Sequence, residues 1–303
     1  MRPNSPGRAA QVFAALGKSV CYVGLFLGMQ VLVMLSAMVG AAVLAAVAGG
    51  SEDEVIAATH NVDVMTLTLI SGLLTIAVVL AFYLLRRKKL SEALWLRPVP
   101  APAMLAGASL APTLYFVVTV VLTLLPRAWT ESYGEASSSI DSGSVIGVIS
   151  VVIVAPVVEE FIFRGLTMNR LNRVMPGWLA VLLSAAAFGL CHGELIWFCY
   201  TFVLGALFGF IDLRAASILP SILAHVVFNA IGQILTFVPE TETGIELVIA
   251  LGVLFIAAVV SPILGRKSIA ALFRPGPKPA PDPPGEWALP SVPGTYDYDP
   301  WEE

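Results

Sequence analysis

Charged residues are scarce in this chain of 303 residues. Only 13% of the residues are Asp, Glu, Lys or Arg, about half the share in an ordinary soluble domain, whereas 57% are hydrophobic. The 17 basic and 21 acidic side chains are too few to cover a soluble protein of this length. The formal net charge of -4 also lacks the basic excess of a nucleic-acid-binding protein. A soluble enzyme, a disordered regulator and a nucleic-acid partner are therefore excluded, and the expected environment is a lipid bilayer.

Cysteine is scarce as well. The three cysteines, Cys21, Cys191 and Cys199, are too few and too scattered for a disulfide framework or a cysteine-based metal site. Segments of alternating hydrophobicity do not recur often enough for a membrane β-barrel. The chain is therefore predicted to be an all-α membrane protein.

Long apolar runs are abundant, and a helix needs about 20 apolar residues to cross the hydrocarbon core. We predict a polytopic bundle of about eight transmembrane helices, near residues 19–48, 64–85, 102–125, 145–163, 177–193, 195–211, 215–237 and 245–264. The predicted organisation is an N-terminal cytoplasmic segment (1–18), three spans with their loops (19–144), a four-span core (145–237), the last span (238–265) and a Pro-rich disordered tail (266–303).

The basic residues support this span count. With the N-terminus in the cytoplasm, 16 of the 17 Lys and Arg residues, Arg164 among them, fall on cytoplasmic segments, and only Arg127 falls outside. Both termini are therefore predicted to be cytoplasmic, in what we expect to be a bacterial cell membrane. The aromatic and acidic end of the tail could bind a cytoplasmic partner, although a passive tail is favoured.

Ionisable residues inside predicted spans are functional candidates, because a charged side chain in hydrocarbon is costly. Glu159 and Glu160 follow a long apolar run, and Arg164 lies four residues after Glu160 in the favourable acid-first order. Glu159 has no counter-ion in its own helix, since adjacent positions lie about 100° apart. Pro156 removes a backbone donor just before the two acids. Taken alone, this cluster is equally consistent with a helix that ends near the headgroups.

Two further spans carry polar residues at four-residue spacing. His192 follows Phe188 by four residues, and Asn229 follows His225 by four. A carboxylate in apolar surroundings beside imidazole can act as a general base, and imidazole and amide groups can stabilise an oxyanion. Glu159, His192 and His225 would alternatively be a zinc ligand set. The residues alone leave both interpretations open, since a single histidine in a helical bundle is usually an interhelical hydrogen bonder.

Taken in order, the three motifs resemble the signature of a known family. Glu-Glu-x-x-x-Arg at 159–164, Phe-x-x-x-His at 188–192 and His-x-x-x-Asn at 225–229 resemble the CPBP family, which comprises CAAX prenyl proteases and bacteriocin-processing or Abi proteins. The resemblance covers roughly residues 145–237. It implies an intramembrane endopeptidase with eight helices.

The resemblance also implies roles for single residues. Glu159 would be the base that activates the attacking water, and His192 would share its proton. His225 and Asn229 would hold the oxyanion of the tetrahedral intermediate. No cofactor is favoured, although a divalent metal such as zinc, held by the glutamate and the two histidines, would activate water equally well.

In this scheme Glu160 and Arg164 would orient the first motif. The implied substrate is a membrane-associated peptide or protein, cleaved in CAAX-type processing or in bacteriocin or signal-peptide maturation. Two other functions remain open: a non-catalytic membrane scaffold or immunity protein of the same fold, and a proton-coupled small-solute transporter. The transporter fits less well, because the intramembrane charge lies only in the second half of the chain.

The predicted depths of two motif residues disagree. Glu159 lies 14 residues into a span that starts at 145, and His192 lies 15 residues into a span that starts at 177 on the opposite face. In a core about 30 Å thick, these positions would miss each other by about 12 Å. One of the two spans must therefore sit differently from the prediction.

The sixth predicted span contains Gly205 and Gly209, a small-xxx-small spacing that permits close helix approach. We interpret this pair as internal packing rather than as a dimer contact, because the bundle has many neighbouring helices of its own.

Overall fold

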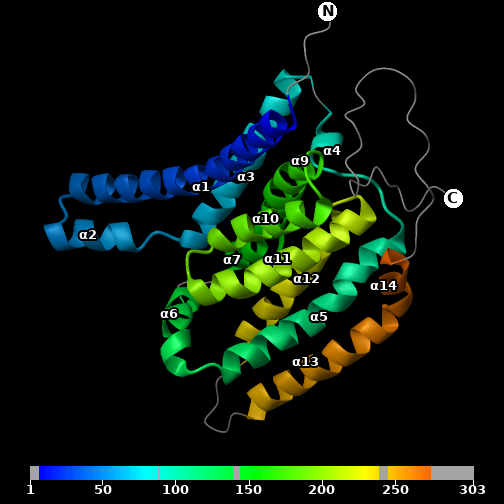
Figure 1. Ribbon diagram of the computed structural model, residues 1–303. Coiled ribbons are helices and arrows are strands. Elements are labelled where there is room, and N and C mark those ends of the chain that lie inside the picture. The colour runs from blue at the N-terminus through cyan, green and yellow to red at the C-terminus, as the bar shows by residue number, and fades with distance from the viewer. Residues whose placement is uncertain (1–6, 88, 139–143, 239–244, 274–303) are drawn as a thin grey trace, which may run out of the picture.

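The computed structural model describes residues 7–87, 89–138, 144–238 and 245–273, and every regular element in these ranges is a helix. Within them, seven helices are long and apolar enough to cross a membrane. These are α1 (Arg8–Val47), α3 (Val64–Leu85), α5 (Ala101–Leu124), the continuous helical run Val145–Asn172, α11 (Leu195–Ala215), α12 (Leu219–Thr236) and α13 (Ile245–Leu264). The helices pack as a bundle from which the outer parts of α1 and α2 project (Figure 1), and the predicted polytopic all-α fold is confirmed.

The fifth predicted span is shorter than expected. α10 (Gly177–Leu190) has 14 residues, about 21 Å of helix, which is too short to cross a core about 30 Å thick. The chain then reverses through Gly193, whose φ of +74° lies in the left-handed region that favours glycine. The Glu194 carboxylate starts α11 by accepting a hydrogen bond from the Trp197 N–H at 2.8 Å. In the ranges that the structure describes, seven helices of spanning length and the shorter α10 therefore stand where eight spans are predicted.

The fourth span, in contrast, is longer than predicted. Its helix begins after Ser144 and runs to Asn172 instead of ending at residue 163. Its consecutive parts are α7 (Val145–Ile149), the π-helix η1 (Ser150–Val154), α8 (Ala155–Glu160), the π-helix η2 (Phe161–Met168) and α9 (Asn169–Asn172). The acidic pair thus lies between two widened turns, a feature that is frequent at functional sites.

The longer fourth span removes the conflict between the predicted depths. Gly177, where α10 begins, packs on Asn172, where the fourth span ends, and a Cβ at Gly177 would meet the Asn172 Oδ1 at 3.1 Å. From this shared level, Glu159 lies 13 residues back and His192 lies 15 residues on. These separations correspond to about 20 and 22 Å along the helices, so the two residues lie at similar depth.

Short helices connect the spans or, in the case of α14, follow the last span. They are α2 (Glu52–His60), α4 (Leu90–Ala93), α6 (Arg127–Ser138) and α14 (Arg266–Leu272). α14 occupies the start of the segment predicted as a disordered tail. It forms because Leu272 is buried and its carbonyl accepts a hydrogen bond from the Arg214 Nε at 2.6 Å. Residues 274–303, with the predicted partner of the tail, lie outside the described residues.

Two helices of the first half begin with acidic caps. Ser51 and Glu54 form a capping box at the start of α2, and the hydrogen bonds from Ser51 lower the pKa of the Glu54 carboxyl. Asp63 caps α3 by accepting from the Met65 N–H and the Thr66 hydroxyl, and the bond from the Thr66 hydroxyl is the main cause that lowers the pKa of Asp63.

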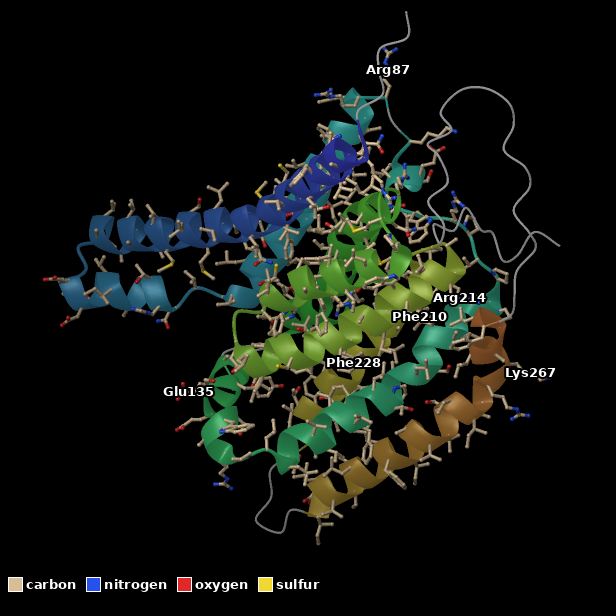
Figure 2. The ribbon with its side chains drawn as sticks, viewed as in Figure 1. Arg87, Glu135, Phe210, Arg214, Phe228 and Lys267 are labelled. Atoms are coloured by element: carbon tan, nitrogen blue, oxygen red, sulfur yellow. The ribbon has the colours of Figure 1, made fainter. Side chains whose placement is uncertain are left out.

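Cations gather at one end of the bundle. Figure 2 shows Arg87, Arg214 and Lys267 on one side of the molecule and Glu135 on the opposite side. We call the first side the basic end and define it by Lys18, Arg87, Lys89, Arg170, Arg173, Arg214 and Lys267. Arg164, which the positive-inside pattern assigns to a cytoplasmic segment, is instead 0% exposed within the bundle.

Gly205 and Gly209 of α11 face the interior of the bundle. A Cβ at Gly205 would meet the Arg164 Nη2 at 3.1 Å, and a Cβ at Gly209 would meet the Met168 Sδ at 3.0 Å. The small-xxx-small spacing therefore serves packing of α11 against the fourth span and against α10, where Ala185 and Val181 lie close to the same two glycines.

We expect Gly205→Leu to lower the free energy of unfolding by roughly 1–3 kcal/mol, because extra atoms in a packed interior displace their neighbours. Gly252→Leu on α13 is the matched control, since a Cβ there would meet nothing within 4 Å. The measurement is thermal unfolding in detergent micelles. Equal effects of the two substitutions would contradict the internal role of Gly205.

Candidate active site

The two glutamates of the first motif differ in exposure and in partners. The Glu160 side chain is 0% exposed, and its Oε1 lies 3.2 Å from the Arg164 Nη1 and accepts a hydrogen bond from the His225 Nδ1 at 2.8 Å. The Glu159 side chain is 18% exposed, and its Oε2 lies 3.6 Å from the His225 Nε2. Glu160 is thus an internal counter-ion, whereas Glu159 is the carboxylate that water or a substrate can reach.

The Phe188 ring joins the three motifs. It lies 4.6 Å from the guanidinium carbon of Arg164, and its centroid lies 4.9 Å from the ring of His192 and 5.9 Å from that of His225. A cation held against a buried aromatic ring is stabilised by the ring quadrupole. The sequence places Phe188 on the same helical face as His192, but its contact with Arg164 requires the packing of α10 on η2.

The hydrogen bonds of the histidines determine which ring nitrogens carry protons. The His192 Nδ1 donates to the Phe188 carbonyl at 3.0 Å. Since a carbonyl oxygen only accepts, the His192 proton lies on Nδ1 and the Nε2 lone pair is free when the ring is neutral. The His225 Nδ1 likewise donates, to Glu160, which leaves its Nε2 facing Glu159. No direct hydrogen bond joins His192 to Glu159 within the described part of the chain.

Asn229 donates a hydrogen bond to a backbone carbonyl that Pro156 leaves without a backbone donor. In η1, an N–H bonds the carbonyl five residues earlier, as the Ala155 N–H bonds Ser150. The next donor in this register would be the nitrogen of Pro156, which carries no hydrogen. The Asn229 Nδ2 donates instead to the Val151 carbonyl at 2.8 Å. This bond anchors the third motif to the helix that carries the first.

Asp212 and Ser221 extend the buried polar cluster, and the sequence pattern did not single them out. Both are 0% exposed, and the Ser221 N–H donates to the Asp212 Oδ1 at 3.2 Å. Ser221 also lies beside the Glu160 carboxylate. The predicted spans 195–211 and 215–237 leave Asp212 in the short segment between them, outside the bundle core. The position of Ser221, four residues before His225, was the signal that could have found it.

Glu159, His192 and His225, the alternative zinc ligands, do not form a preformed metal-binding group. Among the described residues, no three His, Cys, Asp or Glu side chains are arranged to bind one metal ion. The Nδ1 atoms of His192 and His225 have a carbonyl and a carboxylate as hydrogen-bond partners, an arrangement that leaves each Nε2 available as a ligand or as a base.

Residues 141–231 match the family model described as Type II CAAX prenyl endopeptidase Rce1-like. The matched range contains all three motifs, and the match confirms the family resemblance that they carry. It supports an intramembrane endopeptidase in general, and the seven apolar helices indicate an integral membrane protein. Searches of the curated proteins and of the solved structures found no match.

We expect Asn229→Ala to lower the free energy of unfolding by about 1–3 kcal/mol, because it leaves the Val151 carbonyl without a donor. Pro156→Ala supplies a backbone N–H in register with the same carbonyl, so Asn229→Ala should cost less in that background. The measurement is a double-mutant cycle of unfolding in detergent. The same cost in both backgrounds would show that the two residues are uncoupled.

Proposed function

We propose that this protein is an intramembrane endopeptidase in which Glu159 activates water for attack on a peptide bond. The observation that carries the proposal is the unequal environment of two adjacent carboxylates. Glu159 is accessible and lies beside the His225 ring, whereas Glu160 is buried and paired with Arg164. A carboxylate within reach of water beside an oriented imidazole is suited to general-base catalysis. The family match over residues 141–231 supports the same class of reaction.

In the proposed reaction, Glu159 takes a proton from water as the water oxygen attacks the peptide carbonyl carbon. His192, with its free Nε2 lone pair, shares this proton with Glu159. The carbonyl oxygen becomes an oxyanion in the tetrahedral intermediate. The C–N bond then breaks, and the proton passes to the leaving amine.

The oxyanion is assigned to His225 and Asn229 in this proposal. With Nδ1 bonded to Glu160, a doubly protonated His225 ring donates to the oxyanion from Nε2. Asn229 uses one amide hydrogen for the Val151 carbonyl and keeps the second for the oxyanion. Glu160 and Arg164 are positioning residues, because they act through the His225 ring.

We also propose that the substrate is a membrane-associated peptide or protein. Glu159 lies about 20 Å from the inner end of the fourth span, so the scissile bond must enter the bundle from the bilayer or from its surface. CAAX-type processing and maturation of a bacteriocin or signal peptide both present such substrates. The distribution of the basic residues favours cytoplasmic termini, and the basic end of the bundle would then face the cytoplasm.

Glu159→Gln should reduce cleavage by about 100-fold or more with little change in stability, because the side chain is partly exposed and its contact with the His225 Nε2, at 3.6 Å, is longer than a hydrogen bond. Glu160→Gln should reduce both cleavage and stability. It leaves Arg164 buried without a counter-ion, which costs roughly 3–5 kcal/mol. The measurements are cleavage on isolated membranes and the melting temperature of each purified variant. Glu52→Gln, at an exposed acid of α2, is the control with normal activity.

Normal cleavage by Glu159→Gln would overturn the proposed mechanism. Normal cleavage by His225→Ala would remove the oxyanion role from that residue. A chelator separates the remaining schemes: activity that survives thorough chelation argues against a metal. Activity that is lost and then restored by zinc would replace the glutamate scheme with metal-assisted hydrolysis.

A further inference from the structure

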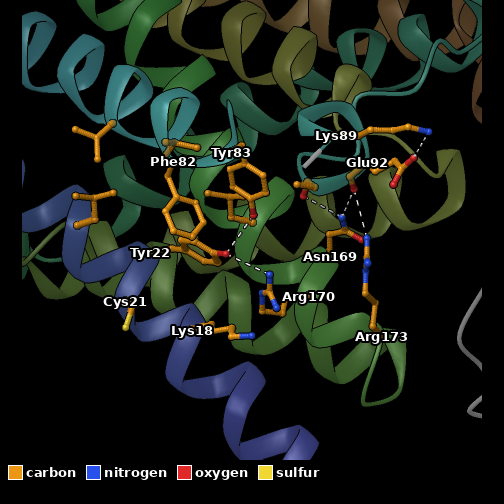
Figure 3. A pocket seen from close by; sticks show the side chains of 15 residues that line it. Lys18, Cys21, Tyr22, Phe82, Tyr83, Lys89, Glu92, Asn169, Arg170 and Arg173 are labelled. Atoms are coloured by element: carbon orange, nitrogen blue, oxygen red, sulfur yellow. Dashed lines mark hydrogen bonds and ion pairs between the residues drawn. The ribbon is translucent and has the colours of Figure 1, made fainter. Parts of the chain in front are cut away.

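A cavity of about 770 Å³ opens at the basic end of the bundle, apart from the acidic pair. It lies between α1, α3, α4 and the end of the fourth span (Figure 3). Arg170, which lines it, follows Glu160 by ten residues in one continuous helix, a separation of about 15 Å. The cavity is therefore a second site, and no residue of the three motifs lines it.

The cavity has an excess of positive charge. Four cations line it, Lys18, Lys89, Arg170 and Arg173, against the single acid Glu92. Glu92 is paired with the Lys89 Nζ at 3.1 Å, whereas Arg173 donates only to the Glu92 carbonyl, at 3.4 Å. In the described ranges, no carboxylate lies within ion-pair distance of the other three cations. The cavity thus presents three positive charges without an anionic partner.

Arg170 is held in place by two tyrosines. Its Nη2 donates to the Tyr22 hydroxyl at 3.2 Å, and this hydroxyl lies 3.2 Å from that of buried Tyr83, as the dashed lines in Figure 3 show. The Arg170 guanidinium also lies 5.7 Å from the Tyr22 ring, and its Nε is buried without a hydrogen-bond partner. A guanidinium oriented in this way offers a planar set of donors that matches a phosphate.

The opposite wall of the cavity is apolar. Val78 and Phe82 of α3 line it, and they are 40% and 45% exposed. Apolar side chains that are exposed on a membrane-spanning helix face acyl chains. Lys18 directly precedes the first predicted span, which starts at residue 19, and Lys89 follows the end of α3 by four residues, so we expect both at the level where headgroups begin. The cavity therefore combines a cationic rim at headgroup depth with a hydrocarbon-facing wall below it.

We propose that this cavity binds the phosphate headgroup of an anionic phospholipid, whose acyl chains lie along α1 and α3. Basic pockets between spanning helices on the cytoplasmic side bind anionic headgroups through the same combination of charge and depth. A zwitterionic lipid would add its own cation to a site that already has an excess of positive charge. The bound lipid would join α1 and α3 to the helix that carries the acidic pair, and this role does not depend on the proposed reaction.

The test compares lipid binding to the purified full-length protein by native mass spectrometry, with phosphatidylglycerol and phosphatidylcholine as probes. We expect the wild type to retain phosphatidylglycerol preferentially and to gain thermal stability from it. Lys18→Gln and Arg170→Gln should each weaken this binding about fivefold. Lys18 is exposed on α1, so its substitution carries no folding cost. Lys267→Gln is the matched control, because Lys267 is an exposed cation of the basic end that does not line the cavity.

Equal binding of the two lipids, or unchanged phosphatidylglycerol binding in Lys18→Gln and Arg170→Gln, would overturn the proposal. Inorganic phosphate separates a lipid from a soluble ligand: stabilisation by phosphate alone that is lost in Arg170→Gln would assign the cavity to a free anion. A chain that ends at Phe273 tests the acidic C-terminal residues as the occupant. If only this shortened chain bound phosphatidylglycerol, the tail and not a lipid would fill the cavity of the full-length protein.

Discussion

Arg164 and Glu160 are both fully buried at the centre of the bundle, where an unpaired charge would be strongly destabilising. The positions of their neighbours follow from this constraint. Gly205 leaves room for the guanidinium on one side, and the Phe188 ring lies against it on another. Glu160 meets both Arg164 and His225, so one helix turn connects the first motif to the third. Glu160 is buried with these two partners, so Glu159 is the carboxylate of the pair that water can reach.

The fourth span acts as the common support for both sites. Its middle carries the acids between two π-helical turns, and its end carries Arg170 at the basic cavity. Pro156 interrupts the backbone hydrogen bonding at η1, and the Asn229 amide replaces the missing donor. The Val151 carbonyl therefore has a donor although the backbone hydrogen bonding of the helix is interrupted at its centre.

Several features could be predicted because they depend on one helix at a time. The pairing of Glu160 with Arg164 follows from their four-residue spacing, and the apolar runs locate the spans. The end of the fourth span was misplaced because Arg164 resembles an interfacial cation when its partners are unknown. The predicted span bounds leave Asp212 between two spans for a similar reason, since its partner Ser221 lies on the next helix. The short α14 was assigned to the tail because its stability depends on packing of Leu272 against other helices.

The order and spacing of charged and apolar residues established a helical membrane protein, its three motifs and the face on which each motif lies. These properties follow from the period of the α-helix and from the cost of polar groups in lipid. Tertiary packing decided three other properties. It determined which glutamate is exposed, which backbone carbonyl accepts a hydrogen bond from Asn229, and where four cations that are distant in the sequence line one cavity. Each of these depends on side chains from separate helices, and the distance between two helices is not encoded in the spacing within either one.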